Sequence, residues 1–146
     1  MNTMHTILYI DDDENDVVLL KHAIRAAQLR CNVQAVNDPE KAAAYLGGKG
    51  QYADRKCFPV PSLVLMDLKM PRMHGLEVLA WIRTQPVLKR LVVIVLTASN
   101  QASEVNRAYE LGANSYLVKP VELEALVELV KGIGAYWLSL NERPGI

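Results

Sequence analysis

Acidic, hydroxyl and basic side chains follow short apolar segments at four places in this sequence. Clustered carboxylates bind hard divalent cations such as Mg²⁺, and an aspartate can accept a phosphoryl group to form an aspartyl phosphate. A lysine ammonium and a threonine hydroxyl can then stabilise the charge on the transferred group. The residues of these types that come directly after the apolar segments are Asp11, Asp12, Asp13, Asp67, Thr97 and Lys119.

The acidic run after Ile10 divides into two parts. Asp11 and Asp12 come first and are expected to face a common site, where a bound cation would relieve the repulsion between them. Asp13, Glu14 and Asp16 are interpreted as solvated residues that begin a helix, because the helix dipole stabilises carboxylates in the first turn.

The elements that must position these residues alternate between two hydrophobic patterns. Short apolar runs, typical of strands buried between helices, cover residues 6–10, 32–36, 62–66, 91–96 and 115–118. Segments with helical spacing of apolar residues lie at 17–27, 39–46, 76–83, 102–111 and 122–138. Asp38 and Pro39 are typical of a helix start, and Gly112 is typical of a helix end.

This alternation predicts an α/β fold with a doubly wound, five-stranded parallel sheet and five helices. Helix-sized connections force neighbouring strands to run parallel, and functional groups gather beyond the carboxyl ends of such strands. The aspartates, the hydroxyl and the ammonium are therefore expected to converge on one pocket. The stretch 47–61 is predicted to be a mobile surface loop.

Length and composition bound the class of protein. The 146 residues suit one domain, 1–146, with a core at 6–138 and a tail at 139–146. The formal net charge is zero, which gives no electrostatic case for a nucleic-acid or membrane partner. No apolar run approaches the roughly 18 residues that span a bilayer, and the N-terminus lacks an export-signal pattern, so a cytoplasmic protein is expected. Cys31 and Cys57 are interpreted as reduced thiols.

Four segments carry a family resemblance. IDDDEND, LVLMDLKMPRMHG, IVLTAS and ANSYLVKP, in this order and spacing, resemble the receiver domain of bacterial two-component response regulators over residues 6–138. The resemblance implies a flavodoxin-like sheet with strand order 2-1-3-4-5.

The resemblance also implies roles for individual residues. Asp67 matches the phosphoacceptor, and Mg²⁺ would be bound by Asp67, by the acidic pair Asp11 and Asp12, and by the backbone carbonyl of Lys69. The switch hydroxyl, the phosphate-pairing lysine and the switch aromatic correspond to Thr97, Lys119 and Tyr116. In many relatives the bond that matches Lys119–Pro120 is cis. Many relatives carry asparagine where this chain has Lys69, and we hypothesise that Lys69 changes the lifetime of the phosphoryl group.

The implied function is that of a stand-alone response regulator. It would accept a phosphoryl group from a sensor histidine kinase and signal through protein binding, without being an enzyme in its own right. The C-terminal segment AYWLSLNERPGI resembles that of single-domain regulators associated with phytochrome-type kinases. No DNA-binding module is expected, since the chain ends shortly after the last predicted helix.

The last predicted helix has more apolar surface than one packed face needs. One stripe consists of Leu123, Leu126, Val127, Val130 and Trp137. A helix that is apolar on two faces is usually covered twice. We therefore hypothesise a homodimer through the fourth helix, the fifth strand and the fifth helix, with a second stripe packed on the partner: Leu129, Ile133, Tyr136 and Leu140.

Other interpretations fit less well. A haloacid-dehalogenase-type phosphatase would use Asp11 as its nucleophile, but that family has threonine or valine where this chain has Asn15, and acidic ligands where it has 97–100. An EF-hand loop starting at Asp11 would have Asp16 where glycine is needed.

The three histidines show no metal-ligand spacing and are interpreted as surface residues: His5, His22 and His74.

Overall fold

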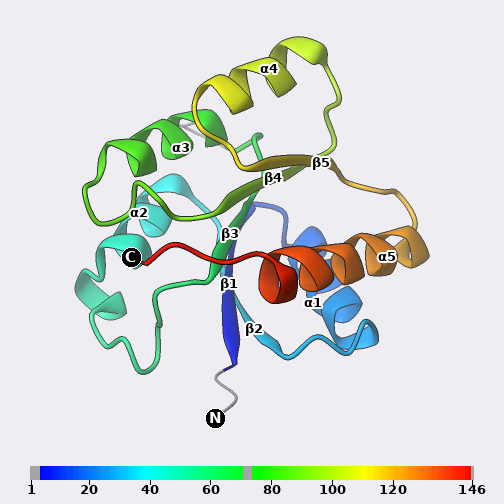
Figure 1. Ribbon diagram of the computed structural model, residues 1–146, viewed down its shortest axis with the longest axis horizontal. Helices are drawn as coiled ribbons and strands as arrows, with labels where there is room; N and C mark the ends of the chain where they lie inside the picture. The colour runs from blue at the N-terminus through cyan, green and yellow to red at the C-terminus, as the bar shows by residue number, and fades with distance from the viewer. Residues whose placement is uncertain (1–3, 71–73, 146) are drawn as a thin grey trace.

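A computed structural model describes residues 4–70 and 74–145 and has a five-stranded parallel sheet at its centre (Figure 1). The strands lie in the order β2-β1-β3-β4-β5, as predicted. Their bounds are β1 (His5–Ile10), β2 (Cys31–Val36), β3 (Leu63–Met66), β4 (Val93–Thr97) and β5 (Ser115–Val118). All four neighbouring pairs are parallel, so every strand delivers its carboxyl end to the same edge of the sheet.

Within the described residues, five α-helices cover the two faces of the sheet (Figure 1). Their bounds are α1 (Glu14–Ala26), α2 (Pro39–Gly47), α3 (Gly75–Thr84), α4 (Ala102–Glu110) and α5 (Leu123–Ile133). Successive residues of a strand point to opposite faces, and β1 follows this rule. Ile7 and Tyr9 pack with α1 and α5, whereas Leu8 and Ile10 pack with α2 and α3. The fold class predicted from the hydrophobic pattern is therefore confirmed.

Helix starts follow local chemistry. Asp38 accepts a hydrogen bond from the amide of Lys41 and Pro39 begins α2, as predicted. The α3 helix begins after His74, whose Nδ1 accepts a 3.2 Å hydrogen bond from the amide of Leu76. The ring of His74 is half-buried, and its role as the cap of this helix was not predicted from the sequence.

The connection between α2 and β3 is more ordered than the predicted mobile loop. It contains a short 3₁₀ helix, Gly50–Tyr52, and the ring of Tyr52 packs at 5.2 Å from that of Tyr45. The guanidinium of Arg55 donates hydrogen bonds to the carbonyls of Tyr45 and Leu46, the last turn of α2. These contacts hold the connection against α2.

The last helix differs from its prediction. It ends as an α-helix at Ile133 and continues as a π-helical segment, Gly134–Leu140. A Cβ at position 134 would clash with the side chain of Leu29, so the glycine lets this segment lie close to the end of α1. Ile133 is only 4% exposed and belongs to the core, which removes it from the predicted interface stripe. Tyr136 and Leu140 are exposed, and Leu129 is half-buried.

Among the described residues, no helix is both long and apolar enough to cross a bilayer. The described cysteines, Cys31 and Cys57, are free thiols, in agreement with their interpretation from the sequence.

Candidate functional site

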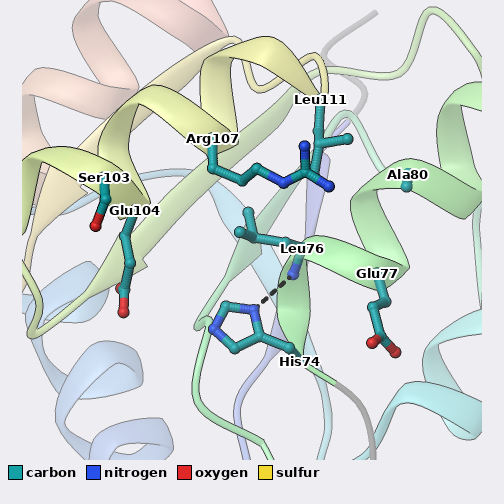
Figure 2. A pocket seen from close by; sticks show the side chains of 8 residues that line it. All are labelled: His74, Leu76, Glu77, Ala80, Ser103, Glu104, Arg107 and Leu111. Atoms are coloured by element: carbon teal, nitrogen blue, oxygen red, sulfur yellow. Dashed lines mark hydrogen bonds between the residues drawn. The ribbon is translucent and has the colours of Figure 1, made fainter.

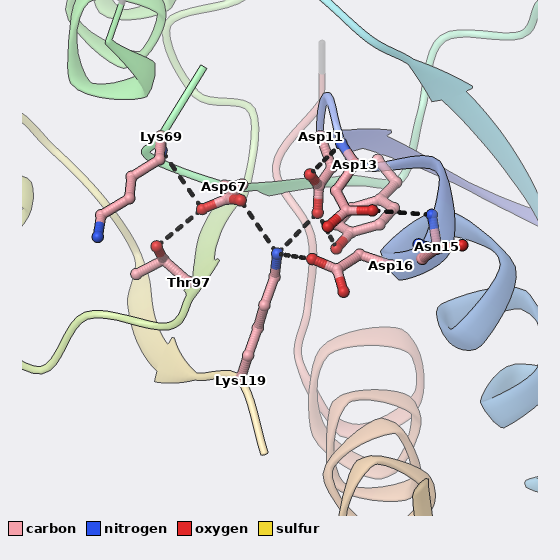
Figure 3. A network of polar contacts seen from close by, with 9 residues as sticks. Asp11, Asp13, Asn15, Asp16, Asp67, Lys69, Thr97 and Lys119 are labelled. Carbon is pink, nitrogen blue, oxygen red and sulfur yellow. Dashed lines mark hydrogen bonds and ion pairs between the residues drawn. The ribbon is translucent and has the colours of Figure 1, made fainter. Parts of the chain in front are cut away.

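The carboxyl edge of the sheet brings together the side chains expected there (Figure 3). Asp11 follows β1 and is 1% exposed, whereas Asp67 follows β3 and is 8% exposed. Thr97 is the last residue of β4, and Lys119 comes directly after β5. Residues more than one hundred positions apart in sequence thus meet at one point.

Asp67 lies at the centre of this group. The hydroxyl of Thr97 donates a 2.7 Å hydrogen bond to Oδ1 of Asp67, and the amide of Lys69 donates a longer one of 3.4 Å to the same oxygen. The ammonium of Lys119 lies 3.0 Å from the other oxygen, Oδ2. The Asp67 carboxylate therefore faces a hydroxyl on one side and a positive charge on the other.

Lys119 forms ion pairs with three carboxylates (Figure 3). Its side chain is 14% exposed. Burial alone would lower the pKa of Lys119, but its hydrogen bonds to the aspartates and the charge of Asp67 outweigh burial and raise it. The Nζ atom lies 2.7 Å from Asp11 Oδ2, 2.7 Å from Asp16 Oδ2 and 3.0 Å from Asp67 Oδ2.

Asp16 is thus part of the site, and its interpretation as a solvated helix-start residue is wrong. The first turn of α1 places its carboxylate against the ammonium of Lys119. The interpretation is right for Asp13, which is exposed and caps α1 by accepting a 2.9 Å hydrogen bond from the amide of Asn15. Charged residues one turn apart therefore have different partners.

Tyr9 is a site residue that the sequence analysis missed. Its ring is buried on the α1 and α5 face of β1, and its hydroxyl donates a 2.6 Å hydrogen bond to Oδ2 of Asp11. Burial and this hydrogen bond raise the pKa of Tyr9, so the hydroxyl keeps its proton and remains a donor. Tyr9 comes two residues before Asp11, so in an extended chain the two side chains point to the same face. This spacing is the feature of the sequence from which the contact could have been predicted.

Two opposing effects act on the pKa of Asp11. Burial raises the pKa of Asp11, and the hydrogen bonds from Lys119, Tyr9 and the amide of Asp13 act in the opposite direction. The Asp13 amide lies 2.9 Å from Oδ1 of Asp11. Both oxygens of this buried carboxylate are therefore held in place by donors.

The predicted acidic residues can hold a divalent cation. Asp11, Asp12 and Asp67 each offer one carboxylate oxygen, and these atoms all lie within 4.8 Å of one another. Asp12 is exposed, which leaves one side of the group open to water. Oxygen ligands with room for water suit Mg²⁺ or a similar hard cation. The donor set of this chain therefore fits such an ion.

The remaining predicted residues lie around this centre. Lys69 is exposed, and its ammonium points away from Asp67 (Figure 3). Tyr116 is half-buried on β5, and its hydroxyl donates a 2.9 Å hydrogen bond to the carbonyl of Ser99. The Lys119–Pro120 bond is trans, so the cis bond implied by the resemblance is not present here, and Lys119 reaches Asp67 without it.

A hollow of about 450 Å³ lies between α3 and α4 (Figure 2). His74 and Leu76 line it from the start of α3, and Glu104 and Arg107 line it from α4. The segment of the quoted motif at 71–73 lies outside the described residues.

Comparisons with known proteins agree with this geometry. A family model for the response regulator receiver domain matches residues 7–131. Response regulator Rcp1 of Synechocystis sp. is 36% identical over 143 residues, which cover 98% of this chain and 95% of that protein.

Two solved structures are similar over nearly the whole chain. The phosphorylated cyanobacterial phytochrome response regulator RcpA has a TM-score of 0.89 and 35% identity, and the match covers 98% of this chain and 100% of that chain. The Mn(2+)-bound form of Rcp1 has a TM-score of 0.84 and 35% identity, and the match covers 97% of this chain and 99% of that chain. Neither the family match nor these relatives support the phosphatase alternative that uses Asp11. This chain belongs to the response regulator receiver domain family.

Proposed function

We propose that Asp67 accepts a phosphoryl group from a phosphohistidine of a sensor histidine kinase. The observation that carries this proposal is the position of the Asp67 carboxylate between the Thr97 hydroxyl at 2.7 Å and the Lys119 ammonium at 3.0 Å. Both groups are placed to stabilise charge on a phosphoryl group attached to Asp67.

The transfer exchanges one bond to phosphorus for another. An oxygen of Asp67 bonds to phosphorus while the bond between phosphorus and the imidazole nitrogen of the phosphohistidine breaks. The nitrogen keeps the electron pair of the broken bond, and the ring takes up one proton to leave as neutral histidine. The chain is then a phosphoacceptor that assists its own phosphorylation and dephosphorylation, and it is not otherwise an enzyme.

A bound Mg²⁺ completes the proposed site. Asp11, Asp12, Asp67 and the backbone carbonyl of Lys69 would hold the ion, which would supply positive charge beside the oxygens of the transferred group. Three carboxylate oxygens within 4.8 Å of one another support the three aspartates of this set, and the Lys69 carbonyl rests on the resemblance alone. A relative whose structure is described as Mn(2+)-bound supports the binding of a divalent ion.

The signal is a change at the face formed by α4, β5 and α5. The new group brings about −1.5 to −2 charges, which draw Thr97 and Lys119 toward it. When Thr97 moves, it vacates space that the ring of Tyr116 can enter. The Tyr116 hydroxyl then gives up its hydrogen bond to the Ser99 carbonyl. This is a shift between two populated states, and the unphosphorylated chain visits both.

The partner at this face is proposed to be a second copy of the chain. Large apolar side chains are exposed on these three elements, on the β5–α5 connection and on the π-helical segment after α5: Tyr109, Val118, Val121, Leu123, Tyr136 and Leu140. An apolar area spread over neighbouring elements is typical of a protein–protein contact. The predicted residues Leu129, Tyr136 and Leu140 remain candidates for this contact, whereas Ile133 lies in the core.

The kinase is proposed to be of the phytochrome type, because a relative that matches along the full chain is described as a phytochrome response regulator. We also propose that the protein acts in the cytoplasm as a single receiver domain, with protein partners and without nucleic acid. The formal net charge of zero supports the last point.

Lys69 adds a positive charge near the transferred group and is proposed to change its lifetime. Its side chain is exposed, and its ammonium would have to turn toward Asp67 to act on the group. The test compares dephosphorylation rates of the wild type and Lys69→Asn. Equal rates would contradict a role for this charge.

The proposed function is tested with a small-molecule acyl phosphate as phosphodonor. In the presence of magnesium we expect one acid-stable, base-labile phosphoryl group per chain. A chelator should suppress its formation, and added magnesium should restore it. Phosphorylation at the same rate with and without the chelator would contradict the proposed metal site, and no phosphorylation under any condition would contradict the function.

A further inference from the structure

The ammonium of Lys119 has three N–H donors, and all three are used. Its partners are one carboxylate oxygen each from Asp11, Asp16 and Asp67. Two of these partners, Asp11 and Asp67, also belong to the group that can hold a cation, and Asp16 does not. The lysine therefore competes with a metal ion for two of its partners and has a third partner of its own.

This competition has an electrostatic consequence. A divalent cation on Asp11 and Asp67 neutralises their charge and repels the nearby ammonium. The Lys119 side chain is 14% exposed, and a poorly hydrated ammonium without a partner is unfavourable. The carboxylate of Asp16 is 32% exposed and remains available to the lysine when the metal binds.

The main chain holds Asp16 in a fixed position relative to the site. The amide of Asp13 donates to Asp11, and the carboxylate of Asp13 caps the first turn of α1 through the amide of Asn15. This turn carries Asp16. The partner of Lys119 outside the metal group is therefore connected rigidly to the loop that carries the metal ligands.

We propose that Asp16 is a positioning residue that holds Lys119 beside the site when a divalent cation occupies Asp11, Asp12 and Asp67. Asp16 thereby lets Lys119 give up Asp11 without becoming unpaired, which favours metal binding and keeps the ammonium within reach of Asp67. This inference rests on the proposed metal site and adds a residue to it that contributes no ligand.

The test measures magnesium affinity of the unphosphorylated protein by calorimetric titration. Asp16→Asn should weaken affinity about three- to tenfold, the range for a partly exposed charge-assisted hydrogen bond, because Lys119 then retains Asp11 and Asp67 more strongly. Glu14→Gln is the matched control, since it removes one charge from the same helical turn at an exposed residue. Asp16→Glu, which keeps the charge, should recover part of the affinity.

A double-mutant cycle separates the proposed role from the charge of Asp16 alone. In a Lys119→Met background, Asp16→Asn should change magnesium affinity less than in the wild type, because the residue through which Asp16 acts is gone. An equal or larger effect in that background would overturn the inference, and so would equal effects of Asp16→Asn and Glu14→Gln. If the wild type binds no magnesium, the metal site fails together with the inference.

A second readout follows Lys119 directly. In the magnesium-loaded wild type, the Nζ hydrogens should be protected from exchange with water, as measured by NMR of the labelled ammonium. Asp16→Asn should remove this protection, while Glu14→Gln should keep it. Protection that survives Asp16→Asn would overturn the inference even if magnesium affinity falls.

Discussion

The hydroxyl of Tyr116 donates a 2.9 Å hydrogen bond to the backbone carbonyl of Ser99, two residues beyond the end of β4. This contact connects β5 to the loop that follows Thr97. Thr97 in turn donates to Asp67, so the aromatic residue and the proposed phosphoacceptor are linked through one strand end. A change in the partners of Thr97 therefore reaches the loop that Tyr116 contacts.

Removal of the Tyr116 hydroxyl should favour the activated state. Tyr116→Phe loses a hydrogen bond with a net value of about 0.5–1.5 kcal/mol, and this bond exists in the conformation described here. The affinity for beryllofluoride, a mimic of the phosphoryl group, should rise roughly two- to tenfold. Tyr109→Phe, on the exposed part of α4, is the matched control and should leave affinity unchanged. Lower affinity in Tyr116→Phe would contradict this account of the switch.

Gly75 is needed because α3 begins very close to Asp67, the proposed phosphoacceptor. A Cβ at this position would clash with the carbonyl of Asp67 and lie 2.9 Å from the Cα of Leu68. Gly75→Ala should lower the free energy of unfolding by about 1–3 kcal/mol, measured by urea titration, because the loop must move. It should also weaken magnesium affinity, since the same loop carries Asp67.

Gly132 provides the control for this prediction. It lies in α5, and a Cβ there would meet no atom within 4 Å. Gly132→Ala should therefore raise the free energy of unfolding by about 0.5–1 kcal/mol through helix propensity alone. Equal effects of the two substitutions would show that close approach at Gly75 has no special cost.

Magnesium should stabilise the folded chain. The carboxylates of Asp11, Asp12 and Asp67 repel one another, and a bound cation relieves that repulsion. At a concentration one hundred times the Kd, magnesium should add about 2.7 kcal/mol to the free energy of unfolding and raise Tm. Asp12→Asn should raise Tm without magnesium and reduce the response to it. An unchanged Tm for the wild type on addition of magnesium would count against the site.

His5 should make stability depend on pH. Burial, and then the charge of Arg143, lowers the pKa of His5, whose Nδ1 lies 2.7 Å from Arg143 Nη1 and 3.0 Å from Ser62 Oγ. Below about pH 6.5 His5 becomes protonated in the unfolded chain, whereas in the folded chain it stays neutral to a lower pH. Protonation therefore favours the unfolded chain, and the free energy of unfolding falls as pH falls.

His5→Gln removes this contribution. Between pH 7.5 and pH 5 the variant should lose less stability than the wild type, by under about 1 kcal/mol because the ring is partly exposed to solvent. His22→Gln, at an exposed position on α1, is the matched control. A variant that loses as much stability as the wild type would contradict the assignment.

The strand ends of the site were predictable from the sequence. Runs of four to six apolar residues determine where strands end, and the residues that follow them, such as Asp67 and Lys119, must then share one edge. Asp16 was not predictable in this way. A carboxylate in the first turn of a helix has the same local pattern whether water or Lys119 is its partner, and this partner is 103 residues away.

The same limit applies to other residues whose roles depend on tertiary contacts. Tyr9 has the pattern of a core residue on a buried strand, and only the length of its side chain brings its hydroxyl to Asp11. The burial of Ile133 and the π-helical segment after it depend on how closely Gly134 approaches Leu29. Hydrophobic periodicity gives the faces of a helix but does not determine which neighbour covers each face.

The central claim is that the phosphoryl group bonds to Asp67, and reductive trapping tests it most directly. Borohydride reduces an aspartyl phosphate to homoserine, and peptide mass spectrometry then identifies the modified position. The account predicts homoserine at position 67 after treatment with phosphodonor and magnesium, and none in the Asp67→Asn variant. Homoserine at position 11 or 12, or unchanged labelling of Asp67→Asn, would contradict it.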